Sequence, residues 1–188
     1  DFKGDYWHSA RWNHSIDLAG KKIGVIGIAA SAIQFCPRLA PIAGELKMFQ
    51  RTANWVVPKP NEPYDEQQLN YYRQNPDAVL ENRNQIYNVW NTLATFGDKQ
   101  VLADIETSGL ARLAEVKDPE TRRQLTPHHP FGCKRPLFSD LYYPIFNRDN
   151  VKLVTDDIAR ISENAIVTAD GTSHDVDCIV YSTGFSTT

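Results

Sequence analysis

The stretch that most constrains the fold of this chain is residues 22–34, which read Lys-Ile-Gly-Val-Ile-Gly-Ile-Ala-Ala-Ser-Ala-Ile-Gln. An apolar run ends there in a glycine, a segment of helical character comes next, and Phe49 to Thr52 follow soon after. This order predicts a buried strand, a tight turn that cradles a phosphate, a helix and a second strand. We therefore expect an α/β fold built on a crossover that binds dinucleotides.

The turn matches the fingerprint Gly-x-Gly-x-x-Gly/Ala at two of its three positions. Gly27 suits the sharp turn out of the strand, and Ala32 is small enough for the helix to pack closely on the strand. The middle position, where glycine lets the backbone approach a pyrophosphate, holds Ala29, whose β-carbon is expected to weaken binding. The pattern also fits a strand and a helix that bind nothing at this turn. The cofactor-binding candidates here are Gly27, Ile28, Ala29, Ala30, Ser31 and Gln34.

An arginine and a threonine stand where the second strand should end. Arg51 lies about 24 residues after Gly27, close to the position where NAD-binding proteins place an Asp or Glu on the ribose 2′-hydroxyl. A guanidinium binds a 2′-phosphate bidentately, whereas a carboxylate repels it. Arg51 and Thr52 therefore predict NADP(H) rather than NAD(H). The alternative is that Arg51 is a solvated surface arginine.

Length, charge and cysteine usage exclude several classes of protein. The chain has 188 residues and a formal net charge of −3, which suits one well-cored domain but not a nucleic-acid or membrane-surface protein with clustered basic residues. No apolar run approaches the ~20 residues that span a bilayer, and no signal-peptide pattern is seen. The three cysteines have no framework spacing. We expect a cytoplasmic protein with no nucleic-acid or membrane partner.

The first part of the chain divides into two segments. Residues 1–20 are aromatic-rich and irregular, and we predict a linker there rather than a core element. Residues 21–58 form the crossover. Its helix must be kinked or short because Pro37 and Pro41 lie in that segment.

A helical insertion is predicted next, at about residues 61–126. Apolar residues recur there at three- and four-residue spacing, which indicates helices. These residues are Leu69, Tyr72, Val79, Leu80, Ile86, Tyr87, Trp90, Leu93 and Ala94. Asp118 and Pro119 then open a short helix, as its cap and its first-turn residue. An insertion of this length suggests a subdomain that shapes a site.

The end of the chain is rich in short strands. Residues 150–154 indicate a returning parallel strand, residues 158–168 a hairpin and residues 177–181 a final sheet strand. The Thr-Gly pair at 183–184 forms a turn at the carboxyl end of that strand, where such folds place cofactors. Residues 21–188 are thus predicted to form a Rossmann-like, three-layer nucleotide-binding domain with a helical insertion and a small β-hairpin element.

Several ordered motifs make the chain resemble one family. Residues 2–12 match Phe-x-Gly-x-x-x-His-x-x-x-Trp, the fingerprint of the flavin-dependent Baeyer–Villiger monooxygenases, which are class B flavoprotein monooxygenases. Residues 50–56, 131–136, 139–143 and 182–185 resemble further segments of the same family. The likeness spans essentially the whole chain and corresponds to the family's NADP-binding domain.

The resemblance implies roles for single residues. Arg135 matches the family's active-site arginine and would be the catalytic residue, because a fixed cation stabilises the anion that forms when reduced flavin meets oxygen. Lys134 would join Arg51 on the 2′-phosphate of the cofactor. The cofactor-binding residues predicted beyond the turn are Arg51, Thr52, Lys134, Thr183 and Gly184.

The resemblance also implies a larger protein. In the family the NADP domain is inserted into an FAD domain, so this chain is expected to be the NADP domain alone. Residues 1–20 would be the interdomain linker, with Gly4, His8 and Trp12 as its fingerprint and hinge residues. The full-length enzyme, which alone would hold FAD, would insert one oxygen atom from O2 beside a ketone carbonyl. The isolated chain is expected to bind NADP(H) without oxygenating anything.

Two alternatives stay open. One is a related flavin monooxygenase that acts on nitrogen or sulfur, although Trp12, residues 50–52 and residues 183–185 favour the Baeyer–Villiger branch. The other is a Rossmann-fold binding module that has lost NADP binding through Ala29. No metal site is expected, because the histidine and cysteine spacings fit no zinc pattern.

Overall fold

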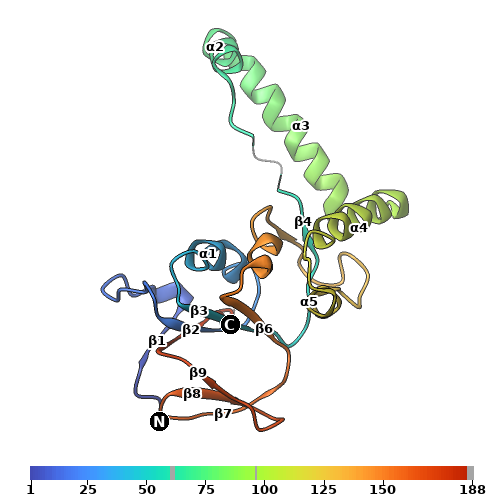
Figure 1. The fold of residues 1–188 in the computed structure, drawn as a ribbon. Coiled ribbons are helices and arrows are strands. Elements are labelled where there is room, and N and C mark those ends of the chain that lie inside the picture. The colour runs from blue at the N-terminus through green and yellow to red at the C-terminus, as the bar shows by residue number, and fades with distance from the viewer. Residues whose placement is uncertain (60–61, 96, 186–188) are drawn as a thin grey trace.

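Five parallel strands form the centre of the computed structural model, which describes residues 1–59, 62–95 and 97–185 (Figure 1). In spatial order they are β1 (Asp5–His8), β10 (Cys178–Tyr181), β2 (Lys22–Ile26), β3 (Glu45–Phe49) and β6 (Val151–Val154). Because every neighbouring pair is parallel, all the carboxyl ends meet at one edge of the sheet. The predicted crossover, returning strand and final strand are confirmed.

Strand β2 marks the point where the strand order reverses. From β2 the chain continues to β3 and β6 on one side, and it later returns to β10 on the other side. In open α/β sheets, the crevice at the carboxyl ends of such a strand pair is where ligands bind.

Two further layers cover the sheet. The helix α1 (Ala32–Leu39) and the 3-10 helix η2 (Tyr143–Asn147) lie over one face. An antiparallel sheet of β7 (Ile158–Ile161), β8 (Ala165–Thr168) and β9 (Ser173–Asp175) lies under the other face (Figure 1). The three-layer α/β class is confirmed, and the predicted hairpin carries a third strand.

Strand β2 shows why both faces are buried. Ile23 and Val25 are fully buried in the core that includes α1. Gly24 points the other way, and a β-carbon there would lie 2.9 Å from Cδ1 of Ile166 on β8. A strand covered on both sides reads as a continuous apolar run, which is the pattern that the sequence presents.

Helix α1 is short, as its prolines predict. It has eight residues, with Pro37 inside it and Pro41 just past its end. Pro37 has no N–H to donate to the helix ladder, and Pro41 cannot extend the helix. The chain therefore turns back early and enters β3.

The expectation that residues 1–20 form no core element is wrong. Residues Asp5–His8 form β1, which pairs in parallel with β10 along its whole length. Trp7 is buried, and its ring meets the ring of Trp12 at a centroid distance of 5.7 Å. Trp12 in turn packs against Phe35 on α1 at 5.1 Å. A strand of four residues whose partner lies at the far end of the chain leaves almost no local pattern to detect.

The predicted insertion is helical. It begins beyond β4 (Val56–Val57) and ends before β5 (Leu137–Phe138), and these two strands pair with each other in parallel. Residue 61, at its predicted start, lies outside the described residues. The helices are α2 (Glu66–Gln74), α3 (Pro76–Ala94), α4 (Lys99–Leu113) and α5 (Pro119–Leu125). The Asp118 carboxylate caps α5 by accepting a hydrogen bond from the Thr121 N–H at 2.7 Å, as the sequence predicts.

Helix α3 projects from the body of the molecule, with α2 at its outer end (Figure 1). Its spacing of apolar residues correctly predicts a helix, but many of these side chains are about half exposed. They are Val79, Leu80, Ile86, Tyr87, Val89 and Trp90. The side chains of Leu93 and Ala94 lie outside the described set. Among the described residues, no helix is both long and apolar enough to cross a membrane.

We predict that Trp7→Ala lowers the free energy of unfolding by ~3–5 kcal/mol, the usual cost of removing a buried tryptophan. Tyr6→Ala is the matched control, since Tyr6 is the neighbouring residue of β1 but is 63% exposed. That variant should change stability by less than ~1 kcal/mol. Urea unfolding of both variants measures the difference. Equal and small effects would mean that β1 is a detachable linker after all.

Candidate dinucleotide-binding site

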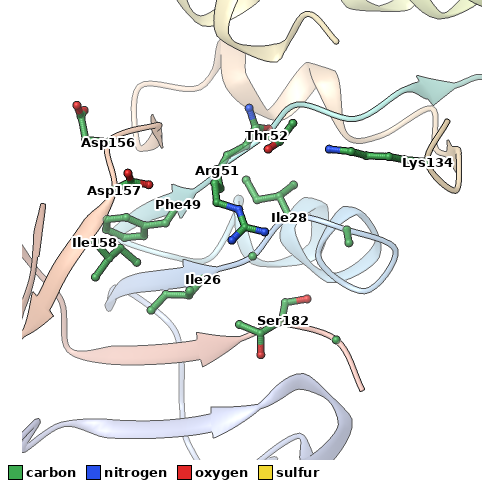
Figure 2. Close-up of a pocket in the computed structure, with 15 residues that line it drawn as sticks. Ile26, Ile28, Phe49, Arg51, Thr52, Lys134, Asp156, Asp157, Ile158 and Ser182 are labelled. Atoms are coloured by element: carbon green, nitrogen blue, oxygen red, sulfur yellow. The ribbon is translucent and has the colours of Figure 1, made fainter. Parts of the chain in front are cut away.

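A cavity of about 570 Å³ lies at the carboxyl ends of β2, β3, β6 and β10, over the point where the strand order reverses (Figure 2). Eight of the predicted cofactor residues line it. They are Gly27, Ile28, Ala29, Arg51, Thr52, Lys134, Thr183 and Gly184. Ala30, Ser31 and Gln34 are not in this lining but lie next to it, in the turn and first turn of α1.

Gly27 is held in place from both sides of β2. Its N–H donates to the carbonyl of Phe49 on β3 at 3.2 Å. On the other side a β-carbon at this position would lie 2.6 Å from the carbonyl oxygen of Ser182, which follows β10. The φ angle of Gly27 is +90°, a conformation that L side chains rarely adopt. Both the backbone angle and the close approach of Ser182 therefore require glycine.

Ala29 fits into the turn without interrupting the helix that follows. Its carbonyl accepts a hydrogen bond from the Ile33 N–H at 3.1 Å, and its side chain is exposed at the cavity. No side chain caps the start of α1 at Ser31, but the Ile33 and Gln34 N–H groups already donate to the carbonyls of Ala29 and Ser31. An anion at this end of α1 would therefore be attracted by the positive end of the helix dipole rather than by those two N–H groups. The Gln34 amide donates to the carbonyl of Ala30 at 2.6 Å, so Gln34 braces the turn.

Arg51 and Thr52 follow β3 after one anchoring residue. Gln50 is buried, its N–H donates to the Val154 carbonyl at 2.8 Å and its side-chain amide donates to the Gln124 carbonyl at 3.0 Å. Gln50 thus fixes the backbone from which Arg51 extends over the cavity (Figure 2). Within the part of the chain that the structure describes, Arg51 forms no ion pair, so its charge is free for a ligand.

Lys134 reaches the same cavity from a loop far away in the sequence. The loop is tied to the segment after β3 by the Asn54 side chain, which donates to the Arg135 carbonyl at 3.1 Å, and by the Leu137 N–H, which donates to the Trp55 carbonyl at 2.9 Å. Lys134 also makes no ion pair with a described carboxylate. Burial and, secondarily, the charge of Lys134 lower the pKa of His129.

Arg135 does not line this cavity. It borders a second cavity of about 1000 Å³ instead, between α3, α4 and the β4–β5 pair. Most of the residues around that second cavity are apolar. They include Val57, Ile86, Val89, Trp90, Ile105, Phe131 and Phe138. Lys134 and Arg135 are consecutive in the sequence, yet they line two different cavities.

The fingerprint residues join β1 to its surroundings. His8 accepts a hydrogen bond from the Ala10 N–H on Nδ1 at 3.2 Å, and its ring meets Phe185 edge-on at 5.7 Å. A β-carbon at Gly4 would collide with the carbonyl oxygen of Asp177 and with the ring of Phe2. Trp12 packs between Trp7 and α1, as described above. These contacts join the start of the chain to the residues on either side of β10 and to α1, and a hinge role stays a prediction.

Several cavity residues escape the sequence reasoning. Asp156 and Asp157, which the sequence indicates only as a turn between strands, stand at the end of the cavity opposite Lys134 (Figure 2). Ser182 is 5% exposed, and its hydroxyl oxygen is buried without a partner among the described residues. Leaving such a group unpaired costs ~1–3 kcal/mol. The sequence places Ser182 in the family-like segment 182–185 and beside Thr183 and Gly184, but it gives Ser182 itself no role. Over the described ranges, no three His, Cys, Asp or Glu side chains gather as metal ligands would.

The fold and the position of the cavity define an α/β domain of the Rossmann type. A model of flavin-binding monooxygenase-like proteins matches residues 1–188. The chain therefore belongs to the flavin-binding monooxygenase-like family, in agreement with the resemblance seen in its motifs.

Named relatives agree with this assignment. The chain is 35% identical over 189 residues to a Baeyer-Villiger monooxygenase of Pseudomonas aeruginosa and 39% identical over 188 residues to an uncharacterised monooxygenase of Mycobacterium bovis. These matches cover 99% and 98% of this chain but only 36% and 38% of the relatives.

Solved structures give the same picture. A steroid monooxygenase bound to NADP superposes with a TM-score of 0.80 at 32% identity, and a cyclohexanone monooxygenase from Rhodococcus sp. Phi1 bound to NADP+ superposes with a TM-score of 0.81 at 29% identity. Both cover 98% of this chain, which spans 43% and 42% of theirs. The chain thus corresponds to less than half of the proteins that it matches.

We predict that Gly27→Ala destabilises the fold by more than Gly171→Ala does. Both glycines have φ near +90°, but nothing lies within 4 Å of a β-carbon at Gly171, whereas Ser182 blocks one at Gly27. The control should lose about 1 kcal/mol from its left-handed backbone, and Gly27→Ala should lose at least ~1 kcal/mol more. Urea denaturation at matched protein concentration measures both. Losses of equal size would contradict the close packing of β2 on β10.

Proposed function

We propose that the chain binds NADP(H) in the cavity at the carboxyl ends of the strands. The observation that carries the proposal is the meeting of Arg51 and Lys134 on the cavity that Gly27 opens, each without an ion pair among the described residues. Two cations whose charges are otherwise unused suit a dianionic 2′-phosphate. The Thr52 hydroxyl, also in the lining, adds a donor beside them.

The turn supplies the second half of the fit. The positive φ at Gly27 lets the chain leave β2 abruptly, and the start of α1 directs the positive end of its dipole toward the turn. A pyrophosphate placed there has its adenosine side over β3, where Arg51 lies. The residues present therefore fit NADP(H) both at its 2′-phosphate and at its central pyrophosphate.

The charge distribution favours one orientation of the cofactor. Lys134 and the carboxylates of Asp156 and Asp157 stand at opposite ends of the cavity, with Arg51 between them (Figure 2). A 2′-phosphate is attracted to Arg51 and Lys134 and repelled from the aspartates. The phosphate is therefore drawn to the side of the cavity where the β4–β5 pair holds Lys134.

We further propose that this chain is the NADP-binding domain of an FAD-dependent Baeyer–Villiger monooxygenase that acts on a ketone. The names of the relatives support the reaction, and the relatives' greater length supports a further FAD-binding part. NADPH held by Arg51, Lys134 and the Gly27 turn would supply the hydride for the flavin chemistry of such an enzyme. A cytoplasmic location stays a prediction of the sequence.

Arg135 has a defined part in that proposal. Its guanidinium is exposed at the rim of the apolar second cavity, and its backbone carbonyl is fixed by Asn54. A fixed cation stabilises negative charge that develops on oxygen during the reaction. The apolar lining suits a ketone with a hydrocarbon body, since burial of such a body is favourable by ~25 cal/mol per Å².

We predict that the chain binds NADPH more tightly than NADH, and that Arg51→Ala removes most of this preference. Hydrogen bonds to a charged group contribute ~1.5–3 kcal/mol, so NADPH affinity should fall about 10- to 100-fold while NADH affinity changes little. Calorimetric titration measures both. Arg160→Ala, which removes an exposed arginine of β7 outside the cavity lining, is the control and should change neither. Equal affinity of the wild-type chain for the two cofactors, or none for either, would remove the role given to Arg51 and Lys134.

We predict that Ala29→Gly raises NADPH affinity several-fold and that Ala29→Val lowers it. The β-carbon of Ala29 stands at the cavity where the backbone should approach the pyrophosphate, so removing it brings the two closer and enlarging it separates them. Titration of the three proteins under one salt condition gives the order. If affinity does not follow side-chain size, Ala29 does not limit binding.

A further inference from the structure

Ser182 carries a polar group that the fold itself does not use. The backbone of Ser182 is held in the fold, because its N–H donates to the Ile26 carbonyl at 2.8 Å and its carbonyl packs against Gly27. Its hydroxyl oxygen, by contrast, is buried and has no hydrogen-bond partner among the described residues. The residue nevertheless lines the dinucleotide cavity (Figure 2). The hydroxyl is thus the one part of Ser182 left without a function in the fold.

A structural role does not explain this hydroxyl. An alanine would fill the same space except for the oxygen, and it would keep the backbone hydrogen bond to Ile26. Serine instead loses the hydrogen bonds that its hydroxyl makes with water in the unfolded chain and gains none in return. Buried polar groups in native proteins are nearly always paired, so an unpaired one in a cavity wall points to a partner that the ligand brings.

The position of Ser182 in the sheet indicates which part of NADP(H) its side chain would contact. β10 lies on one side of β2, whereas β3 and β6 lie on the other. Arg51 follows β3, so the 2′-phosphate and the adenosine belong to that side of the Gly27 turn. Ser182 lies across the turn from them, on the side where the cofactor continues beyond its first phosphate.

We propose that, when NADP(H) binds, the Ser182 side chain turns about its Cα–Cβ bond and its hydroxyl donates a hydrogen bond to an oxygen of the nicotinamide-side phosphate. This inference rests on the proposed function, because it needs the cofactor in this cavity. The phosphate oxygen is charged, so the bond is stronger than one between neutral groups. Ser182 thereby positions the half of the cofactor that carries the reactive ring.

Binding of three ligands distinguishes a contact between Ser182 and the nicotinamide-side phosphate from a general loss of binding in the cavity. NADP+ and 2′-phospho-ADP-ribose both contain the nicotinamide-side phosphate, whereas 2′,5′-ADP lacks it. Ser182→Ala should weaken binding of the first two about tenfold, the loss expected for one hydrogen bond to a charged group, and should leave 2′,5′-ADP binding unchanged. Ser182→Cys, which keeps the shape but donates weakly, should fall between. Calorimetric titration of the 188-residue chain gives all the affinities.

The ligand-free melting temperature supplies an independent readout. Removing an unpaired buried hydroxyl should leave it unchanged or raise it, so affinity and stability move in different directions. Ser162→Ala is the matched control, because the Ser162 hydroxyl already donates to the Ala165 carbonyl at 3.1 Å in the β7–β8 turn. That variant should lose stability and keep its affinity.

Each other outcome has a definite meaning. If Ser182→Ala binds NADP+ as the wild-type chain does, or loses 2′,5′-ADP equally, or melts earlier without ligand, the proposal for Ser182 is wrong while NADP(H) binding stands. If the wild-type chain binds none of the three ligands, the proposed function is wrong as well.

Discussion

The close contact of Gly27 with the backbone of Ser182 is the constraint on which the rest of the site depends. Gly27 also donates its N–H to the carbonyl of Phe49, so the end of β2 is attached to β10 on one side and to β3 on the other. Three strand ends are thereby held at one level. The cavity lies where the chain continues as a loop from each of these three strands. The polar groups that line the cavity belong to the residues directly after the strands.

A second constraint brings charge to this cavity. The segment that carries Arg51 runs into β4, and the loop that carries Lys134 runs into β5. The β4–β5 pairing and the bond from Asn54 to the Arg135 carbonyl hold the two segments together. In the sequence, the whole helical insertion lies between β4 and β5. It therefore separates Arg51 from Lys134 along the chain, while the pairing of β4 with β5 keeps the two residues close in space. Two strands of two residues each thus account for a convergence that the sequence does not reveal.

Local chemistry explains which parts of the molecule were predictable. The apolar run of β2, the glycine at its end, the prolines of α1 and the Asp118 cap of α5 are all short-range signals, and the structure agrees with each. The strand β1 was missed because its partner β10 lies at the other end of the chain. The sequence does not assign Ser182, Asp156 or Asp157 to the cavity either, because serine and aspartate after a strand are ordinary turn residues. Their place on the cavity follows only from the strand order. The apolar spacing of α3 predicts a helix correctly but does not reveal that several of its described apolar side chains stay about half exposed.

The peptide between Lys134 and Arg135 divides two chemical environments. On one side the cavity holds free charges of both signs, as a charged cofactor requires. On the other side an apolar cavity of almost twice the volume has Arg135 at its edge. The Asn54 side chain restrains the backbone at this point through its hydrogen bond to the Arg135 carbonyl. Two adjacent residues thus bring one cation to each of two cavities whose linings share no residue.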